Sequence, residues 1–437
     1  MEAEPATSSW NASAWKSMSN LLYRGSDYAD PDFEGLKGVQ TGEWLNSQRV
    51  LVIGAGGLGC EILKDLALSG YRDVHVIDMD HIDVTNLNRQ FLFREKDVGK
   101  SKAEVASAFI NQRCGHLGIN VTAHHGKIQD KDMDFYAGFN AIIAGLDNVD
   151  ARRWLNCTLY GMVESGSPAI PLIDGGTEGF RGQARVIVPG VTSCFECSLD
   201  SFPPQVNFPM CTIAETPRLP EHCIEYALVV IWPNEFKERK PDNDSAEDMQ
   251  WIFKKAEERA RNFGIEGVTY QLTMGVVKRI IPAIASTNAL ISAALVSECT
   301  KALTYCGKVL NSYMMYMGKD SVYINTFEYA KNPSCLVCAK DAAIPLEAPG
   351  SQTLQDFMDS LKTEPRLQLA RPSMSCADAV VFQQAPKPIR VLHEYKLSKT
   401  LNELVEENVL KAGVSVLSVT DPKLPGSNVT IELKILE

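Results

Sequence analysis

The sequence has no apolar run long enough to cross a membrane and no secretion signal. No stretch approaches the roughly 18 consecutive apolar residues of a membrane span, although 45% of the residues are hydrophobic. The first 26 residues are polar, with neither a basic start nor an apolar core. We therefore expect an intracellular protein, cytoplasmic or nuclear, with no membrane partner, and we interpret residues 1–43 as a flexible lead-in.

Basic residues are not in excess, and no internal repeat or low-complexity tract is present. The 43 Lys and Arg against 54 Asp and Glu give a net charge of −11. This balance argues against nonspecific binding to nucleic acid and mildly favours a partner with a basic face. A chain of 437 residues is long enough for two or three domains.

A glycine-rich turn follows the first apolar run of the chain. Residues 50–53 are β-branched and apolar, and residues 60–69 carry apolar side chains at helical spacing, which predicts strand, turn and helix. The turn contains Gly54, Gly56, Gly57 and Gly59, of which the first, second and fourth fit G-x-G-x-x-G. Missing side chains there let a phosphate approach the amide groups at the helix start, so we predict a nucleotide site.

Polar residues beyond this turn distinguish two kinds of nucleotide. Asp78 and Asp80 end the next apolar run, about 20 residues on, where an acid can hold a ribose hydroxyl. This much also fits a dehydrogenase with a nicotinamide cofactor. Arg89, Gln90 and Lys102 follow, and two cations suit a triphosphate better than a nicotinamide. A solvated surface is the alternative interpretation of these three residues.

Alternation of apolar runs and helical segments continues to about residue 201 and predicts an α/β fold, a doubly wound and mostly parallel sheet. Ligands collect at the carboxyl ends of such strands. Asp147 follows the apolar run 141–146 and is a candidate magnesium ligand beside a triphosphate, or a helix cap.

The chain divides by texture into further segments. We predict that residues 44–201 and 271–341 form the two parts of the sheet domain and that the proline-rich residues 202–270 form an insertion. Residues 342–351 read as a linker with two prolines. Residues 352–437 mix helical and alternating patterns and predict a separate small α+β domain without clustered catalytic residues, hence a binding domain.

Two C-x-x-C pairs occur far apart in the chain. They are formed by Cys194 with Cys197 and by Cys335 with Cys338. One such pair could be a redox motif, but two favour a single four-cysteine zinc site. Cys60, Cys157 and Cys299 lie among apolar helical residues and are best interpreted as small buried side chains. Cys211 lies among prolines and small polar residues, which favours an exposed thiol and a candidate nucleophile.

The succession Gly54-Ala-Gly-Gly-Leu-Gly59, Asp78-Met-Asp80, Asn86-Leu-Asn-Arg-Gln-Phe91, Gly99-Lys-Ser-Lys102 and Gly145-Leu-Asp-Asn148 resembles the adenylation domain of ubiquitin-like modifier activating enzymes, a ThiF/MoeB-like superfamily. The paired C-x-x-C motifs match as well. The segment Pro209-Met-Cys-Thr-Ile-Ala214 resembles, more narrowly, the catalytic-cysteine loop of neddylation activating enzymes. The similarity extends from about residue 44 to the end of the chain.

The resemblance implies a role for each matching residue. Asp80 would hold the ATP ribose; Asn86, Arg89, Gln90 and Lys102 would belong to the ATP site with the glycines; Asp147 would hold magnesium; Cys211 would form a thioester; and the four paired cysteines would bind structural zinc. The C-terminal region would be a ubiquitin-fold domain that recruits the conjugating enzyme. A homologous cysteine-less subunit would complete a heterodimer.

The implied activity is ATP-dependent adenylation of a modifier's C-terminal glycine, transfer to Cys211 and transfer to a conjugating enzyme. Arg185 matches a position where neddylation enzymes carry an arginine that would repel modifier tails with arginine, by like charge. An ordinary strand arginine is the alternative. Activation of another ubiquitin-like modifier, or of a sulfur carrier, also remains open.

Overall fold

The computed structural model describes residues 27, 29, 45–201, 217–237, 239, 241–242, 245–277, 284–311, 313–339, 343–377, 379–425 and 428–436. The chain forms two compact units: residues 203–282 make one, and the residues before and after them make the other. Among the described helices, none combines the length and the apolar character needed to span a membrane.

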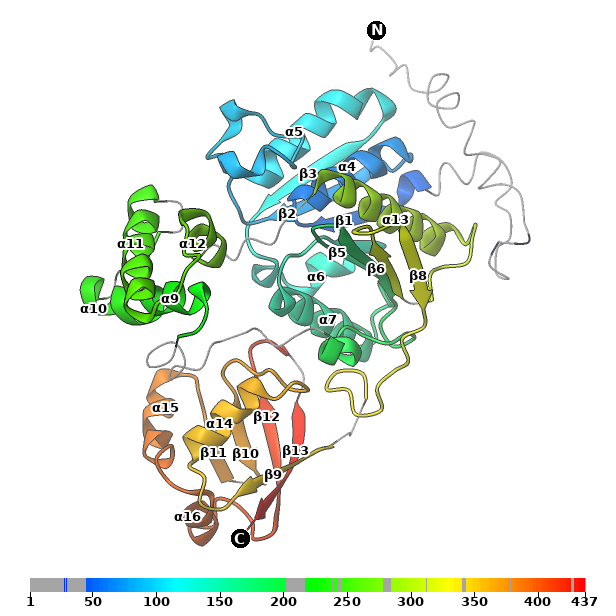
Figure 1. The fold of residues 1–437 in the computed structure, drawn as a ribbon. Coiled ribbons are helices and arrows are strands. Elements are labelled where there is room, and N and C mark those ends of the chain that lie inside the picture. Colours follow the sequence, from blue (N-terminus) through cyan, green and yellow to red (C-terminus); the bar gives the residue numbers. More distant parts are fainter. Residues whose placement is uncertain are drawn as a thin grey trace. The chain divides into compact units, whose positions relative to one another are not determined.

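The first unit contains an eight-stranded sheet (Figure 1). Its strands are β1 (Arg49–Ile53), β2 (Asp73–Asp78), β3 (Asn120–His125), β4 (Ala141–Ala144), β5 (Leu172–Glu178), β6 (Arg181–Ile187), β7 (Tyr313–Met317) and β8 (Tyr323–Phe327). They lie in the order β3-β2-β1-β4-β5-β6-β7-β8. The first five strands in that order pair in parallel and the rest pair antiparallel. The predicted doubly wound, mostly parallel sheet is confirmed.

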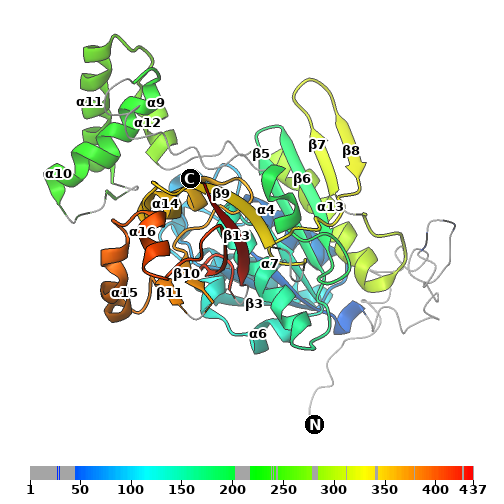
Figure 2. The same cartoon turned by 90° about the horizontal axis from the view of Figure 1, so that it is seen from below.

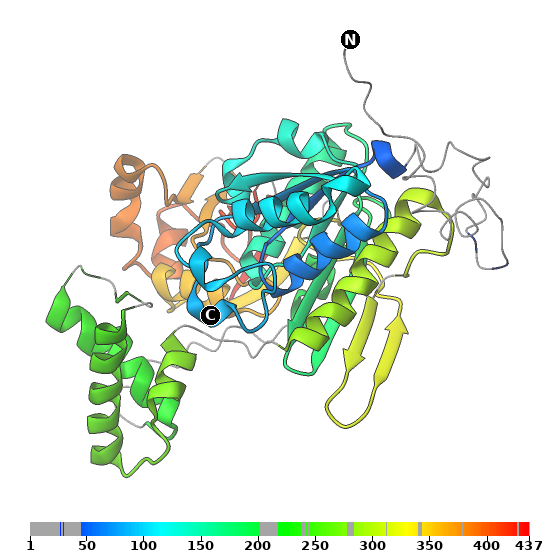
Figure 3. The ribbon, with the colours of Figure 1, turned by 90° about the horizontal axis from the view of Figure 1, so that it is seen from above.

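Helices cover both faces of this sheet. One face carries α4 (Gly57–Leu68), α5 (Lys102–Cys114) and α13 (Ala285–Thr304), and the other carries α6 (Met133–Ala137) and α7 (Val149–Glu164). Figure 3 shows the first set in front of the sheet, and Figure 2 shows α6 and α7 from the opposite side. In β1, Val50 and Val52 enter one core while Leu51 and Ile53 enter the other. Burial on both faces explains why residues 50–53 of this strand are all apolar.

Short 3-10 helices connect these elements. They are η1 (Val84–Asn86), η2 (Glu95–Asp97), η3 (Gly115–Leu117), η4 (Ile128–Asp130), η5 (Glu196–Ser201) and, nearer the C-terminus, η7 (Glu394–Lys396). Of these, η1 and η5 carry or adjoin residues singled out in the sequence.

The regular elements described in the second unit are all helices. It contains α9 (Pro220–Tyr226), the π-helix η6 (Ala227–Ile231), α10 (Trp232–Phe236), α11 (Ala246–Phe263) and α12 (Tyr270–Val277). The side chain of Ser245 caps α11, which buries Ile252 and Ala256 on its apolar side. Packing of α12 against α9 and α11 extends this unit past residue 270.

A small mixed sheet forms the C-terminal region. Its elements are β9 (Ala343–Pro349), α14 (Leu354–Thr363), β10 (Ser373–Cys376), β11 (Ala379–Phe382), α15 (Lys387–His393), α16 (Leu401–Glu406), β12 (Val414–Thr420) and β13 (Val429–Leu436). The strand order is β11-β10-β12-β13-β9. Leu354, Phe357, Met358 and Leu361 of α14 are all buried, and their i, i+3, i+4, i+7 spacing places them on one face of the helix. The predicted α+β domain is confirmed.

The prediction of a linker at residues 342–351 needs correction. Its residues 343–349 form β9, which pairs in parallel with β13 along its whole length. Proline is tolerated in this strand because β9 lies at the edge of the sheet, where one side of the backbone needs no donor. The segment therefore belongs to the C-terminal domain.

Candidate functional site

The glycine turn closes tightly between β1 and α4. Gly54 has a φ of +94°, and its N–H donates to the Ile77 carbonyl over 2.9 Å. A Cβ on Gly59 would collide with the Gly54 carbonyl, and one on Gly57 would collide with the Asn288 side chain. Gly56 caps α4 without a side-chain hydrogen bond, so the first-turn amides have no such partner. Amides of this kind bind phosphate.

The two aspartates at the end of β2 have different surroundings. The Asp78 carboxylate accepts hydrogen bonds from the N–H groups of Ala55 at 2.6 Å and Asp80 at 2.8 Å. Burial raises the pKa of Asp78 despite these two bonds. Asp80 instead has a half-exposed side chain that pairs with Lys102 at 2.9 Å. Asp78 therefore fixes the turn, whereas Asp80 is accessible to a ligand.

Lys102, at the first turn of α5, has only 9% of its surface exposed. Gln90 is also buried, and its Oε1 atom has no hydrogen-bond partner among the described residues. Its Nε2 atom lies 3.8 Å from the position that a Cβ on Gly56 would occupy. The site thus holds an unsatisfied buried acceptor next to the glycine turn, which fits a hydroxyl or amino donor of a bound nucleotide.

Asn86 and Arg89 make local contacts. The Asn86 side chain accepts from the Asp83 N–H at 3.0 Å and closes η1, while Arg89 donates to the Thr85 carbonyl at 2.7 Å. The Cγ atom of Arg89 lies 3.6 Å from the Cβ position of Gly57, which places Arg89 beside the glycine turn.

Asp147 is exposed in the loop that follows β4. This loop adjoins the glycine turn, since the Gly145 N–H donates to the Ile53 carbonyl at 2.9 Å and the Gly145 carbonyl lies 2.9 Å from the Cβ position of Gly54. The carboxyl ends of β1, β2 and β4 therefore bring the glycines, Asp80 and the loop of Asp147 to the same edge of the sheet.

Arg185 lies in the sheet interior and is 4% exposed. Its guanidinium donates to Asp174 at 3.2 Å and to the Ser198 hydroxyl at 2.7 Å, and it stacks on the Phe195 ring. Burial would raise the pKa of Asp174, but Arg152 and Arg185 more than offset this and lower it. Arg152 also donates to the Leu146 carbonyl, next to Asp147. Sequence reasoning missed Arg152, Asp174 and Asn288, since nothing in their local sequence distinguishes them.

The four paired cysteines converge. Their sulfur atoms all lie within 4.8 Å of one another, with the Cys194–Cys335 pair at 3.5 Å and the Cys197–Cys338 pair at 3.3 Å. Tetrahedral zinc with bonds of about 2.3 Å would hold sulfurs about 3.8 Å apart. Hydrogen bonds within the cluster lower the pKa of Cys197 and raise the pKa of Cys194. The cluster fits a zinc ion.

Of the remaining cysteines named in the sequence, three lie in the described part of the chain and one lies outside it. Cys60, Cys157 and Cys299 are buried as predicted, and burial raises the pKa of Cys60 and Cys299 to about 12. Cys211, the candidate nucleophile, lies outside the described residues, as does the lead-in to residue 43 apart from residues 27 and 29.

Comparison with known proteins identifies two family matches. Residues 33–337 match the ThiF family, and residues 347–435 match the E2 binding domain. Several relatives carry the name NEDD8-activating enzyme E1 catalytic subunit, among them three from different organisms. The one from Dictyostelium discoideum is 48% identical (96% of both chains), that from Caenorhabditis elegans 49% (84% of this chain, 86% of the relative), and that from Drosophila melanogaster 45% (95% and 93%).

Among solved structures, E. coli MccB with ATP is similar at a TM-score of 0.44 and 21% identity, covering 70% of this chain and 71% of that one.

Proposed function

The chain belongs to the ThiF family and, within it, to the NEDD8-activating enzyme E1 catalytic subunits, and from this we propose that the edge formed by the glycine turn, Asp80, Lys102 and the loop of Asp147 binds ATP and adenylates NEDD8. As an E1 catalytic subunit with an E2-binding domain, the chain is an activating enzyme that passes its modifier to an E2. The observation that carries the proposal is the Asp80–Lys102 pair beside the uncapped start of α4.

Each residue at this edge has a proposed role in ATP binding. Asp80 accepts a hydrogen bond from a ribose hydroxyl, which suits its half-exposed carboxylate. Lys102 and Arg89 neutralise the phosphates, and the unsatisfied buried Oε1 atom of Gln90 accepts a hydrogen bond from a hydroxyl or amino group of the nucleotide. Asn86 supports the site by closing η1, and Arg89 and Gln90 lie just after this helix in the chain. The glycines supply backbone amides.

The reaction has two stages. The C-terminal carboxylate of the modifier attacks the α-phosphorus of ATP, the bond to the bridging oxygen breaks, and pyrophosphate leaves with both electrons of that bond. Lys102 and Arg89 stabilise the charge that develops on the phosphates. The Cys211 thiolate then attacks the carbonyl carbon of the acyl adenylate, AMP leaves, and a thioester remains that retains an activated acyl group.

Two metals have proposed sites. Asp147 would hold magnesium, since this ion prefers one or two carboxylates together with phosphate oxygens and water. When bound, magnesium supplies positive charge to the phosphates. The four-cysteine cluster would hold structural zinc and so join the two ends of the sequence between residues 194 and 338.

The proposed partners follow from the family. The C-terminal domain, proposed as a ubiquitin fold, recruits the conjugating enzyme, and a homologous cysteine-less subunit completes a heterodimer in the cytoplasm or nucleus. We propose that Arg185 disfavours modifiers with arginine near the C-terminus through like charge. Asp174 already pairs with this arginine, so the repulsion would be partly neutralised.

A single reaction tests the proposed ATP site and the proposed nucleophile. The chain, its partner subunit, ATP with magnesium and candidate modifiers are mixed, and a reducible adduct is sought by gel and mass spectrometry. Cys211→Ala should retain ATP–pyrophosphate exchange and lose the adduct. Cys223→Ala, a change of a buried cysteine in the same unit, is the matched control and should retain both. An adduct that persists in Cys211→Ala would move the nucleophile elsewhere, and absent exchange in the unaltered enzyme would refute the ATP site.

A further inference from the structure

One arginine is completely buried where the cysteine loop meets the C-terminal domain. Arg153, in the second turn of α7, has 0% exposure. Its Nε and Nη2 atoms donate to the two carboxylate oxygens of Glu196 at 2.6 and 3.0 Å, and Glu196 is also buried. Burying such a pair is costly unless further hydrogen bonds satisfy the remaining donors.

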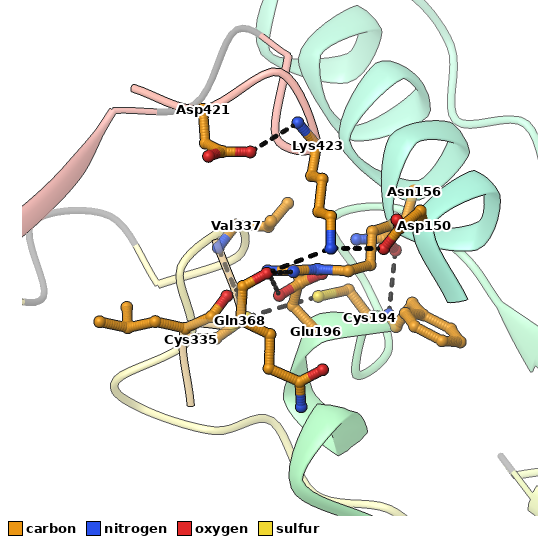
Figure 4. A network of polar contacts seen from close by, with 12 residues as sticks. Asp150, Asn156, Cys194, Glu196, Cys335, Val337, Gln368, Asp421 and Lys423 are labelled. Carbon is orange, nitrogen blue, oxygen red and sulfur yellow. Dashed lines mark hydrogen bonds and ion pairs between the residues drawn. The ribbon is translucent and has the colours of Figure 1, made fainter. Parts of the chain in front are cut away.

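The remaining donors of Arg153 reach the C-terminal domain. Nη1 donates to the Gln368 carbonyl and Nη2 to the Leu367 carbonyl, each at 2.8 Å. A second cation, Lys423, pairs with Asp150 of α7 at 2.8 Å and donates to the same Gln368 carbonyl at 3.5 Å. Figure 4 shows Lys423 between Asp150 and the Gln368 carbonyl. Two basic side chains, one from each side, thus converge on one backbone carbonyl.

The segment that receives these bonds is itself held in shape. Gln368 has a φ of +44°, which non-glycine residues rarely adopt. The Asp421 carboxylate accepts from the N–H groups of Ala370 and Arg371 at 2.9 and 2.7 Å, which fixes the backbone just after Gln368. The carbonyls at 367 and 368 are therefore presented as a preformed pair of acceptors.

Glu196 lies within the first cysteine loop of the four-cysteine cluster. It lies between Cys194 and Cys197, and the Asn156 side chain accepts from the N–H of the neighbouring Phe195 at 2.9 Å. The cysteines share one hydrophobic core with the C-terminal domain, which includes Leu361 and Leu367. Closing the loop around a metal would set the carboxylate that orients Arg153.

We propose that Arg153 is a positioning residue that couples the metal-binding cysteine loop to the placement of the E2-binding domain. The guanidinium fork suits this role because it spans a carboxylate and two carbonyls at once, which a lysine ammonium cannot do. This proposal rests on the proposed transfer of the modifier to an E2. It does not depend on which residues bind ATP. A metal at the cysteine cluster would then influence the placement of the E2-binding domain as well as the conformation of its own loop.

The test uses the full chain labelled at two exposed positions by unnatural amino acids, one in place of Asp130 and one in place of Glu406, for single-molecule energy transfer. Arg153→Lys retains the charge opposite Glu196 and loses the carbonyl contacts. It should broaden the distance distribution between the labels and raise the KM for the conjugating enzyme on the order of tenfold. ATP–pyrophosphate exchange should remain unchanged. Arg366→Lys is the matched control, since Arg366 pairs with Glu364 inside the domain and should alter neither quantity.

A second experiment, removal of the metal, distinguishes coupling between the cysteine loop and the E2-binding domain from a simple loss of the Arg153 contacts. Removal of the metal by a chelator should broaden the distribution of the unaltered chain and add little to Arg153→Lys, with far-UV circular dichroism reporting that the fold persists. Glu196→Gln gives the same comparison with the metal retained and should broaden the distribution too. A narrow distribution in Arg153→Lys, or equal chelator effects with and without Arg153, would overturn the proposal. Absent pyrophosphate exchange in the unaltered enzyme would instead count against the proposed ATP site.

Discussion

Asp80 and Asp174 both belong to the sheet and both pair with basic side chains, yet their surroundings differ. The Asp80 side chain is 51% exposed and has one basic partner, Lys102. The Asp174 side chain is 2% exposed and pairs with Arg152 and Arg185, with Gln183 as a further donor. Asp80 has acceptor capacity left for a ligand, whereas Asp174 has its capacity used within the protein. The first environment suits binding and the second suits support of the fold.

The largest effect is expected at the buried carboxylate. Asp174→Asn leaves two buried guanidinium groups without their anion and should lower the free energy of unfolding by about 3–5 kcal/mol. Urea denaturation measures it. Asp80→Asn, the matched change at the exposed carboxylate, should cost less than about 1 kcal/mol. Equal losses for the two variants would remove the distinction between the two sites.

The same carboxylate predicts how stability depends on pH. Its pKa in the folded protein is lowered below the ordinary value of 3.8. The contribution of Asp174 is therefore fully present above that ordinary value and is lost as the pH falls through the lower pKa of the folded state. Thermal unfolding between pH 5 and 2 should show a steeper loss for the unaltered chain than for Asp174→Asn. Parallel curves would contradict the assignment.

Lys102→Ala should affect activity more than stability. Loss of a preorganised cation at the phosphates should reduce ATP–pyrophosphate exchange about 100- to 1,000-fold, while the free energy of unfolding changes little. Lys100→Ala, which removes an exposed lysine paired with Asp97, is the control and should retain exchange. Unchanged exchange in Lys102→Ala would remove Lys102 from the phosphate site.

Gln90→Met should give a smaller effect of the same kind. The Oε1 atom has no partner among the described residues, so its loss costs the fold little. Loss of one neutral hydrogen bond to the ligand should lower kcat/KM for ATP by about three- to tenfold. Steady-state exchange kinetics measure this. A large fall in the melting temperature with unchanged kinetics would make Gln90 a structural residue.

The smallest effect is expected at a fully solvated pair. Lys434 and Glu347 join β13 to β9 at 2.8 Å, with both side chains more than half exposed. Lys434→Ala should change the free energy of unfolding by less than about 1 kcal/mol. Chemical denaturation with and without added salt checks this, and a salt-insensitive loss above that size would contradict it.

Local patterns predicted much of the fold and the position of the site. The apolar run of β1 and the helical spacing of α4 are visible without any partner, and the glycines between them mark the turn. Each C-x-x-C motif has a metal-ligand spacing that is visible in the local sequence. The presence of two such motifs therefore predicted that they converge on one metal. The prolines of β9 led to a wrong prediction, since both linkers and strands at the edge of a sheet tolerate proline.

Long-range partners could not be predicted in the same way. Nothing near Arg153 distinguishes it from Arg152, yet one pairs with Glu196 and the other with Asp174. Asp78 and Asp80 are two residues apart, and only the structure showed that the first accepts a hydrogen bond from the Ala55 amide. Such roles depend on groups brought together by the fold rather than by neighbouring residues.

Chemical labelling of the chain gains from the burial of its thiols. Of the eleven cysteines in the described part, all are buried except Cys338, which is partly so and belongs to the metal cluster. With a pKa of about 12, the Cys60 and Cys299 thiols are almost wholly protonated at pH 8 and react slowly with alkylating reagents. The twelfth cysteine is Cys211. A mild electrophile added to the metal-loaded protein would therefore have little background, and the label incorporated per chain would titrate competent enzyme.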